Sequence, residues 1–254
     1  MRFPLFAVAV IGLLSAASAQ AAPDADIVIL GEVHDNAASH QGQANALRAL
    51  APKAVVFEML TAEQAAAANA NPADLPAIWA EGAWPDYALY APIFDALGSA
   101  TIVGAAAPRS EIAVVYTDGA AGLFGPDAAQ YGLTEPLPAA QQSEREDLQF
   151  AAHCEAMPRN LMAGMVDVQR YRDAVFARAA LTALSTHGGP VAVIAGNGHA
   201  RTDWGIPAAI KRAAPEVRTH AIGFVEHDTG TPFDDIRLVP PAQRGDPCAA
   251  LLSD

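Results

Sequence analysis

The sequence predicts an α/β protein in which a mostly parallel sheet is flanked by helices and carries a helical insertion or cap. Short apolar runs rich in β-branched residues recur along the chain, and longer helical stretches separate them. Hydrophobic residues make up 52% of the composition and charged residues 17%, which is enough apolar material for a large core. Continuous apolar strands separated by helices are typical of a parallel sheet that is covered on both faces.

Five runs are the expected strands of this sheet. A helical stretch at 40–50 follows the first run, and an Ala-rich helical segment at 61–70 follows the second. The expected strands are 26–30, 54–60, 101–107, 190–195 and 217–225.

The region between the third and fourth expected strands, about 108–189, has a helical pattern. Gly125-Pro126 and the segment 136–138 interrupt this pattern. We interpret the region as a helical insertion or cap over the active end of the sheet. Residues 23–254 are then expected to form a single domain.

The N-terminus has the features of a secretory signal peptide over residues 1–22. Arg2 is the positive charge, 3–17 is apolar, and 17–19 is a small-residue cleavage site. The apolar run is shorter than the ~20 residues that span a bilayer, although an uncleaved anchor is the alternative. No Cys follows the run, so a bacterial lipid anchor is not supported there. We expect a periplasmic or secreted protein without a transmembrane segment after cleavage.

Two cysteines, Cys154 and Cys248, lie in the expected mature chain. An even count in an oxidising compartment predicts one disulfide. Two free thiols, or a thiolate ligand at Cys154, are the alternatives. A zinc site built from several cysteines is excluded by their number.

The formal net charge is −13. Such an acidic chain is not expected to bind nucleic acid or anionic lipid. Local arginines would have to hold any anionic ligand.

Polar side chains gather where the expected strands end, and the carboxyl ends of parallel strands are where ligands bind in open α/β sheets. Each residue also has a structural explanation: a histidine after a strand is often a turn residue, and a buried Glu58 could form a core ion pair with Arg109 or Arg201. The shared position favours a functional pocket. The candidate catalytic residues are Glu32, His34, Glu58, Arg109, His199 and Arg201, and Asp203 follows the same strand as His199.

Several chemistries fit these residue types. His34 and His199 with Glu32 and Glu58 could bind a divalent metal, or could carry out general acid–base chemistry without one. Arginines nearby would bind carboxylates. The sequence has no zinc-protease helix, nucleophile elbow, phosphate loop or dinucleotide fingerprint.

Two long motifs resemble the ChaN-like family of haem-binding, iron-regulated bacterial proteins. The first is Gly-Glu-Val-His-Asp-Asn at 31–36, with His40 and Gln43, and the second is Gly-Asn-Gly-His-Ala-Arg-Thr-Asp-Trp-Gly-Ile-Pro at 196–207. The resemblance runs from about 26 to 226. It also includes the segment 55–60, Pro108-Arg109, Gln169, and Arg172-Asp173. Ala105-Ala106-Ala107 departs from the family, where an Asn is expected.

The resemblance implies an α/β core with a helical subdomain and a wider kinship with TIKI proteases and erythromycin-esterase-like hydrolases. In that superfamily two Gly-x-x-His motifs mark the pocket, and here they match 31–34 and 196–199. The family implies haem as the cofactor and a role in iron uptake. A Tyr or His would ligate iron, and Arg or His would hold the propionates. The expected cofactor-binding residues are His153, Tyr171, Arg172 and Asp203.

The first hypothesis is therefore a periplasmic haem-binding protein of iron uptake, in which two subunits of a homodimer could share the haem. The surplus of acids and histidines at the strand ends motivates a second one, a hydrolase of esters, amides or peptides, with or without a metal. A module that binds another small molecule without catalysis is the third.

Overall fold

The computed structural model describes residues 22–246 and 248–249. Six parallel strands form one sheet in the order β3-β2-β4-β1-β5-β6. Their bounds are β1 (Ile27–Glu32), β2 (Ala54–Phe57), β3 (Thr101–Gly104), β4 (Val191–Gly196), β5 (Thr219–Val225) and β6 (Asp235–Leu238). The predicted parallel sheet with flanking helices is confirmed.

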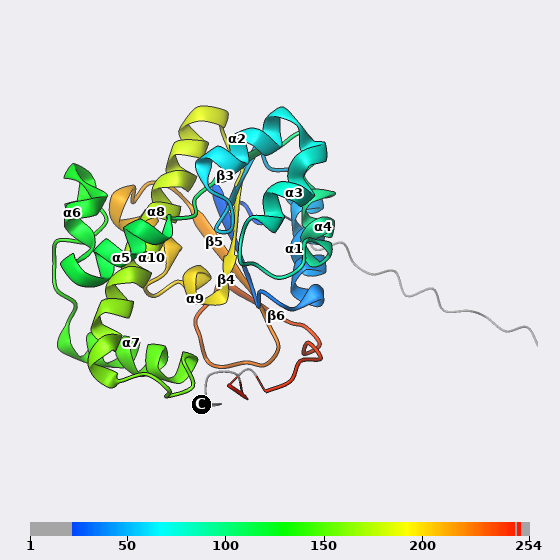
Figure 1. Ribbon diagram of the computed structural model, residues 1–254. Helices are drawn as coiled ribbons and strands as arrows, with labels where there is room; N and C mark the ends of the chain where they lie inside the picture. The colour runs from blue at the N-terminus through cyan, green and yellow to red at the C-terminus, as the bar shows by residue number, and fades with distance from the viewer. Residues whose placement is uncertain (1–21, 247, 250–254) are drawn as a thin grey trace, which may run out of the picture.

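Helices cover both faces of the sheet (Figure 1). The α-helices are α1 (Ala37–Leu50), α2 (Ala62–Ala70), α3 (Leu75–Ala80), α4 (Tyr87–Phe94), α5 (Arg109–Asp118), α6 (Ala120–Phe124), α7 (Ala139–Ala152), α8 (Met162–His187), α9 (Asn197–Ala200) and α10 (Ile206–Ala213). Three 3₁₀ turns complete the order: η1 (Pro72–Asp74), η2 (Pro126–Ala129) and η3 (Arg159–Leu161).

Alternate residues of the strands pack into two different cores. Val28, Leu30 and Phe57 face helices α1 to α4 in one core, whereas Ile27 and Ile29 face α8 and α10 in the other. Successive side chains of a strand point to opposite faces. A strand with helices on both faces must therefore be apolar at every position, as the first expected strand is.

The segment between β3 and β4 is helical and contains α5 to α8. A third apolar cluster, which includes Val115, Phe124, Tyr171 and Ala174, joins α5 and α6 to α8. In Figure 1 this cap lies at one side of the sheet, and the long helix α8 runs from the cap back across the strands.

Three details differ from the sequence-based expectation. The second and third strands end at Phe57 and Gly104, three residues earlier than predicted, and the chain turns at Glu58 directly after the second strand. The edge strand β6 was missed, since its four residues alternate between half-buried and exposed and give no apolar run. Strands of this kind are hard to distinguish from loop in a sequence.

The predicted disulfide is confirmed, because Cys154 is bonded to Cys248. It joins the end of α7 to the C-terminal segment. The expected signal peptide lies outside the described residues except for Ala22. Among the helices of the described chain, none combines the length and the apolar character needed to cross a membrane.

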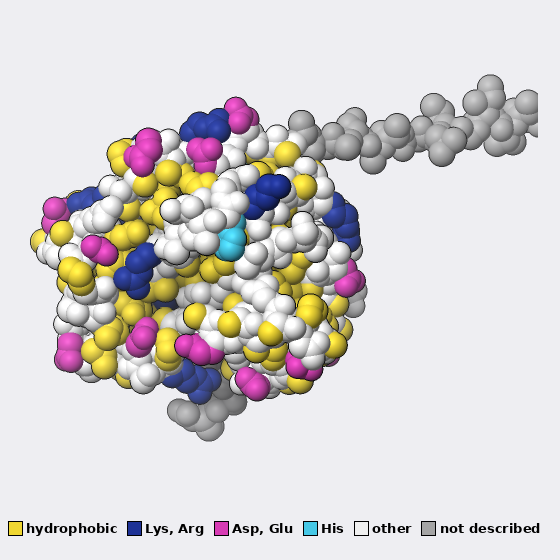
Figure 2. All heavy atoms as spheres, turned by 90° about the horizontal axis from the view of Figure 1, so that it is seen from above, with side chains coloured by type: hydrophobic (Ala, Val, Ile, Leu, Met, Phe, Trp, Pro, Cys, Tyr) yellow, Lys and Arg dark blue, Asp and Glu magenta, His cyan; other side chains and the backbone are white. Residues whose placement is uncertain are grey.

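Figure 2 shows the face of the molecule at the top of Figure 1, where α2 and the last turns of α8 lie. Hydrophobic side chains gather in a hollow on this face, and acidic and basic side chains lie around it. One shallow pocket of the molecule is lined by Val103 of β3, by Ala105 directly after that strand, and by Val175, Ala179 and Ala183 of α8.

Candidate functional site

The register of the central strands brings the two Gly-x-x-His motifs together. Strands β1 and β4 are neighbours, and Glu32 lies opposite Gly196 in their parallel ladder. Strand β2 lies on the other side of β4, and the backbone N–H of Glu58 donates to the oxygen of Ile194 at 3.1 Å. Residues that are far apart in sequence therefore meet at the carboxyl edge of the sheet, as the strand-end rule predicts.

The first half of the site is built around the carboxylate of Glu32, which is buried. Its Oε1 lies 2.8 Å from Nδ1 of His34 and accepts a hydrogen bond from the Tyr90 hydroxyl at 2.6 Å. The same hydroxyl also donates to the backbone oxygen of His34 at 3.1 Å. The ring of His40, on α1, is also close to this carboxylate, with its Nε2 3.5 Å from Oε1 of Glu32.

These contacts decide the charge of the first half. Burial opposes ionisation of Glu32, but the hydrogen bonds and charges of His34 and His40 outweigh it and lower the pKa of the carboxyl to about 2. Burial works against the charged imidazole of His34, yet Glu32 and Glu58 raise its pKa above the ordinary value. Glu32 is therefore ionised near neutral pH, and its negative charge favours the protonated form of His34.

The second half is built around His199, whose side chain is 7% exposed. Its Nδ1 lies 2.6 Å from Oδ1 of Asp173 on α8, and its Nε2 lies 3.5 Å from Oε1 of Glu58. The Gln169 amide lies 3.0 Å from Nδ1. The other oxygen of Glu58 accepts a hydrogen bond from the backbone N–H of Gly196 at 2.7 Å.

The charges of the second half are shared by the imidazole and its carboxylates. Burial opposes the protonation of His199, but Glu58 and Asp173 raise its pKa. Burial also raises the pKa of Asp173, against the opposite effect of His199 and Arg145. The proton between Asp173 and His199 is therefore held by both partners, and the pair is best treated as one unit.

The two halves meet over Gly196. A methyl group placed on this glycine would lie 2.8 Å from Nε2 of His34 and 3.7 Å from Oε2 of Glu58. The glycine is thus required by close approach, since any side chain would displace the imidazole. His34 Nε2 and the Glu58 carboxylate therefore both lie close to the backbone of Gly196.

The four residues that were expected as metal ligands form two acid–base pairs. Three of the four ring nitrogens of His34 and His199 already face a carboxylate oxygen of the protein. Within the described ranges, no group of three or more His, Cys, Asp or Glu side chains is arranged to hold a metal ion.

The other predicted catalytic residues lie outside this centre. Arg201 forms two hydrogen bonds with Asp203, at 2.6 and 2.7 Å, and its guanidinium lies 3.5 Å from the ring centroid of Trp204. Arg109 is the first residue of α5 and is exposed. The geometry therefore groups Arg201 with Asp203 and places Arg109 at the exposed start of α5.

The expected cofactor-binding residues of the cap are spread over several places. Tyr171 is buried in the third apolar cluster, and its hydroxyl donates to Glu111 at 2.8 Å. Burial raises the pKa of Tyr171 to about 12, with a further contribution from Glu111, so this placement favours a packing role. Arg172 is half-buried on α8, and its charge acts to lower the pKa of His199.

His153 ends α7 and is partly buried. Its Nδ1 lies 2.7 Å from the backbone oxygen of Gln149. This bond fixes Nδ1 as the protonated nitrogen and leaves Nε2 with its lone pair. The disulfide at Cys154 anchors the chain directly after it.

A pocket of about 260 Å³ opens beside the second half of the site, between α7, α8 and α9. Its apolar wall is made by Leu148, Val166 and Trp204, and Arg201 and Gln169 add polar groups. Gly198 lies on its floor, next to His199. The second Gly-x-x-His motif is thus accessible from an amphipathic pocket beneath the cap.

Sequence reasoning missed two residues of the centre and undervalued a third. Tyr90 lies in the middle of α4 and Trp84 in the loop before it, and the ring of Trp84 lies 5.0 Å from the ring of His34. Neither follows a strand, so the strand-end rule could not find them. Asp173 is part of the sequence motif that resembles the family, but the sequence assigned it no role. Its contact with His199 in the structure shows that it belongs to the centre.

Comparisons with known proteins give the family. A family model described as "Haem-binding uptake, Tiki superfamily, ChaN" matches residues 18–210. A solved structure described as cofacial haem binding to ChaN of Campylobacter jejuni is 20% identical, covers 84% of this chain and 86% of its own, and has a TM-score of 0.64. The structure of the type III effector HopBA1 is 14% identical, covers 79% and 77%, and has a TM-score of 0.40. No curated protein matches the sequence. The family match spans most of the chain, and the chain therefore belongs to the haem-binding uptake family of the Tiki superfamily that includes ChaN.

Proposed function

We propose that this chain is a periplasmic haem-binding protein that contributes to iron uptake. The observation that carries the proposal is the family match over residues 18–210. Three features of the described residues support it. These are an amphipathic pocket beneath the cap, arginines at its edge, and a histidine with one unbonded ring nitrogen beside it.

The pocket under the cap suits one edge of a porphyrin. Leu148, Val166 and Trp204 offer apolar contacts to the ring, and Arg201 lies where a propionate could bind. The pocket of about 260 Å³ is smaller than the ~300–1,000 Å³ that encloses a drug-sized ligand. The remainder of the porphyrin would therefore lie outside it, where a second subunit could cover the exposed face.

His153 is the residue that we assign as the iron ligand. It follows Ala152, which lines the pocket together with Gln149. Its Nδ1 is bonded to the Gln149 carbonyl oxygen at 2.7 Å, which orients the ring and leaves Nε2 to ligate. The Cys154–Cys248 disulfide holds this turn in place. Tyr171 has no part in this proposal because its hydroxyl is bonded inside the cap.

A haemin titration of the purified mature protein tests the proposal. We expect a saturable Soret shift with defined stoichiometry, well above an albumin-like non-specific background. His153→Ala should change the ligand-sensitive bands and weaken binding, whereas His227→Ala, at an exposed histidine far along the chain, should leave the spectrum unchanged. Sedimentation with and without haemin would report whether two subunits share the ligand. A featureless titration of the wild-type protein would refute haem binding.

The centre itself favours a second candidate, an acid–base hydrolase of an ester or amide. The specific observation is that His34 Nε2 and Glu58 Oε2 both lie close to Gly196. In this mechanism a water molecule loses a proton to Glu58 as it attacks the carbonyl carbon, and the protonated form of His34, which Glu32 and Glu58 favour, donates a proton to the departing group. Glu32 orients the ring of His34 through Nδ1, and the Tyr90 hydroxyl holds Glu32 in place.

Ester and peptide libraries would test the hydrolase. If a substrate is found, the variant with both His34→Ala and His199→Ala should lose turnover by orders of magnitude, because the proton donor and the electrostatic support of Glu58 are both removed. Haem affinity should survive in the same variant, since His153 is distant from both changes in sequence and on another helix. Unchanged turnover would eliminate this mechanism without affecting the haem proposal.

A further inference from the structure

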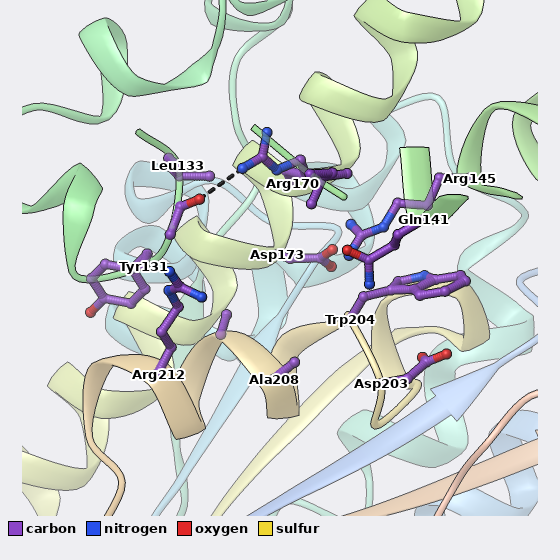
Figure 3. A pocket seen from close by; sticks show the side chains of 13 residues that line it. Tyr131, Leu133, Gln141, Arg145, Arg170, Asp173, Asp203, Trp204, Ala208 and Arg212 are labelled. Atoms are coloured by element: carbon purple, nitrogen blue, oxygen red, sulfur yellow. Dashed lines mark hydrogen bonds between the residues drawn. The ribbon is translucent and has the colours of Figure 1, made fainter. Parts of the chain in front are cut away.

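A second, polar pocket lies on the other side of α8 from the centre. It has a volume of about 200 Å³ and opens between α7, α8 and α10. Figure 3 shows that Arg145, Gln141 and Asp173 point toward one another beside the ring of Trp204, while Arg170 and Arg212 lie at the opposite end. Three arginines and two aspartates line it, so the pocket is locally basic in a chain of net charge −13.

Two charged groups in this pocket lack the partners that burial demands. Arg145 is 8% exposed, and its Nε has no hydrogen-bond partner among the described residues. Asp173 is 2% exposed, and its Oδ2 is likewise unpartnered within that part of the chain. Burial lowers the pKa of Arg145 to about 10, despite the nearby charge of Asp173. A buried cation and a buried carboxylate oxygen without hydrogen bonds are each costly.

The other charged residues of the pocket are already satisfied. Arg170 donates to the backbone oxygens of Gly132 and Glu135 at 2.7 and 2.8 Å. Arg212 forms an ion pair with the Glu135 side chain. Both oxygens of Asp203 are bonded by Arg201. Only Arg145 and Asp173 remain to recognise a ligand.

We propose that this pocket binds a compact carboxylate that also carries a hydrogen-bond donor, as α-hydroxy and α-amino acids do. The carboxylate of the ligand accepts from the Arg145 guanidinium, and its hydroxyl or ammonium group donates to Asp173 Oδ2. The volume of about 200 Å³ lies below the ~300–1,000 Å³ of pockets for drug-sized ligands. The ligand is therefore small, and Trp204 covers its apolar side.

This site is distinct from the haem pocket of the proposed function and does not rest on it. The two pockets share Arg145 and Trp204, which form the wall between them. Asp173 joins the polar pocket to the centre, because its Oδ1 is bonded to His199 while its side chain lines the pocket and points toward Arg145 (Figure 3). A bound ligand should therefore be sensed at His199 but not at His34.

Calorimetric titration of the haem-free protein with glycolate and with glycine tests the proposal. We expect saturable binding of both, with a dissociation constant of about 1 mM or lower, and a change in tryptophan fluorescence. Acetate, which lacks the donor, should bind at least tenfold more weakly. In NMR spectra the ring resonances of His199 should shift with glycolate while those of His34 stay in place. Equal binding of acetate, or saturation without a His199 shift, would overturn the proposal.

Arg145→Met and Arg159→Met form a matched pair of variants. Arg159 is exposed, pairs with Asp147 and does not line the pocket. We expect Arg145→Met to weaken glycolate binding at least tenfold and Arg159→Met to leave it unchanged. Arg145→Met should still fold, since a buried cation without a hydrogen-bonded partner is replaced by an apolar chain of similar length. A large loss of stability on Arg145→Met, or binding that survives it, would show that the pocket holds only water.

Discussion

His34 and His199 occupy equivalent places in two Gly-x-x-His motifs but have different environments. His34 has a side chain that is 35% exposed and one carboxylate partner, Glu32, at 2.8 Å. His199 is 7% exposed and lies between Asp173 and Glu58, at 2.6 and 3.5 Å. The same local spacing has thus produced one partly exposed ring with a carboxylate at Nδ1 only, and one buried ring whose two nitrogens both face protein carboxylates.

The long helix α8 makes the difference. It passes over the second motif and contributes Asp173 and also Phe176, whose ring lies 4.9 Å from that of His199 at 76°. At the first motif, helix α4 contributes the Tyr90 hydroxyl to Glu32 and no carboxylate to His34, and the ring of the partly buried Trp84 lies 5.0 Å from the ring of His34. We infer that His199 supports the site electrostatically, whereas His34 is the histidine that can exchange a proton with a ligand or substrate.

The largest expected effect of this difference is on stability. His199→Ala should lower the free energy of unfolding by about 3–5 kcal/mol, because it leaves buried Asp173 and Glu58 without their shared cation. His34→Ala should cost about 1 kcal/mol, because Glu32 keeps the Tyr90 hydroxyl and His40 as partners. Urea denaturation at pH 6, followed by circular dichroism with the disulfide intact, measures both.

The control for this comparison is His227→Ala, at an exposed position, which should change the unfolding free energy by no more than about 0.5 kcal/mol. Equal losses in the His34 and His199 variants would contradict the division of roles.

A smaller effect separates the two glycines of the second motif. Gly196→Ala places a methyl group 2.8 Å from His34 Nε2 and should cost about 1–3 kcal/mol through overpacking. Gly198→Ala meets only the Gln169 amide at 3.7 Å, within a helical turn, and should be neutral or stabilising by up to about 1 kcal/mol. The same denaturation experiment on both variants measures the difference. If Gly198→Ala were the more damaging change, the packing of His34 against Gly196 would be wrong.

The features that the sequence predicted well are those that depend on local pattern and strand ends. The parallel sheet followed from apolar runs that must be buried on both faces. Glu32, His34, Glu58 and His199 met at one edge because the ladder sets Glu32 opposite Gly196. The disulfide followed from an even cysteine count in a chain that was expected to be exported.

The features that sequence reasoning missed depend on how helices pack. Tyr90 reaches Glu32 from α4, 58 residues away. Asp173 reaches His199 from α8, 26 residues away, and nothing in its helical surroundings distinguishes it from a solvated acid. Arg201 was predicted as a catalytic residue and Asp203 as a cofactor-binding residue, and these two residues, two positions apart in the chain, bond each other. A strand end fixes a position, whereas the rotation of a helix about its axis is decided only by the core.

The smallest expected effect is on the pKa values of His34 and His199. It is the most direct test of the difference between their environments. The pKa of each histidine is raised above 6.5, that of His34 by Glu32 and Glu58 and that of His199 by Glu58 and Asp173. We therefore expect Glu32→Gln to lower the pKa of His34 alone, Asp173→Asn to lower that of His199 alone, and Glu58→Gln to lower both. NMR titration of the ring resonances measures all three variants.

The sign of the linked stability follows from the raised values. A group whose pKa is higher in the folded than in the unfolded chain stabilises the fold below about 6.5, and this contribution is lost as the pH rises through the folded-state value. The difference in unfolding free energy between wild type and His199→Ala should therefore decrease above neutral pH. The difference in unfolding free energy between wild type and His34→Ala should also decrease as the pH rises. This decrease should be smaller than for His199→Ala, because the ring of His34 is more hydrated. If Glu58→Gln changed the pKa of only one of the two histidines, the charge of Glu58 would act on that histidine alone, and the two halves of the site would not share this carboxylate.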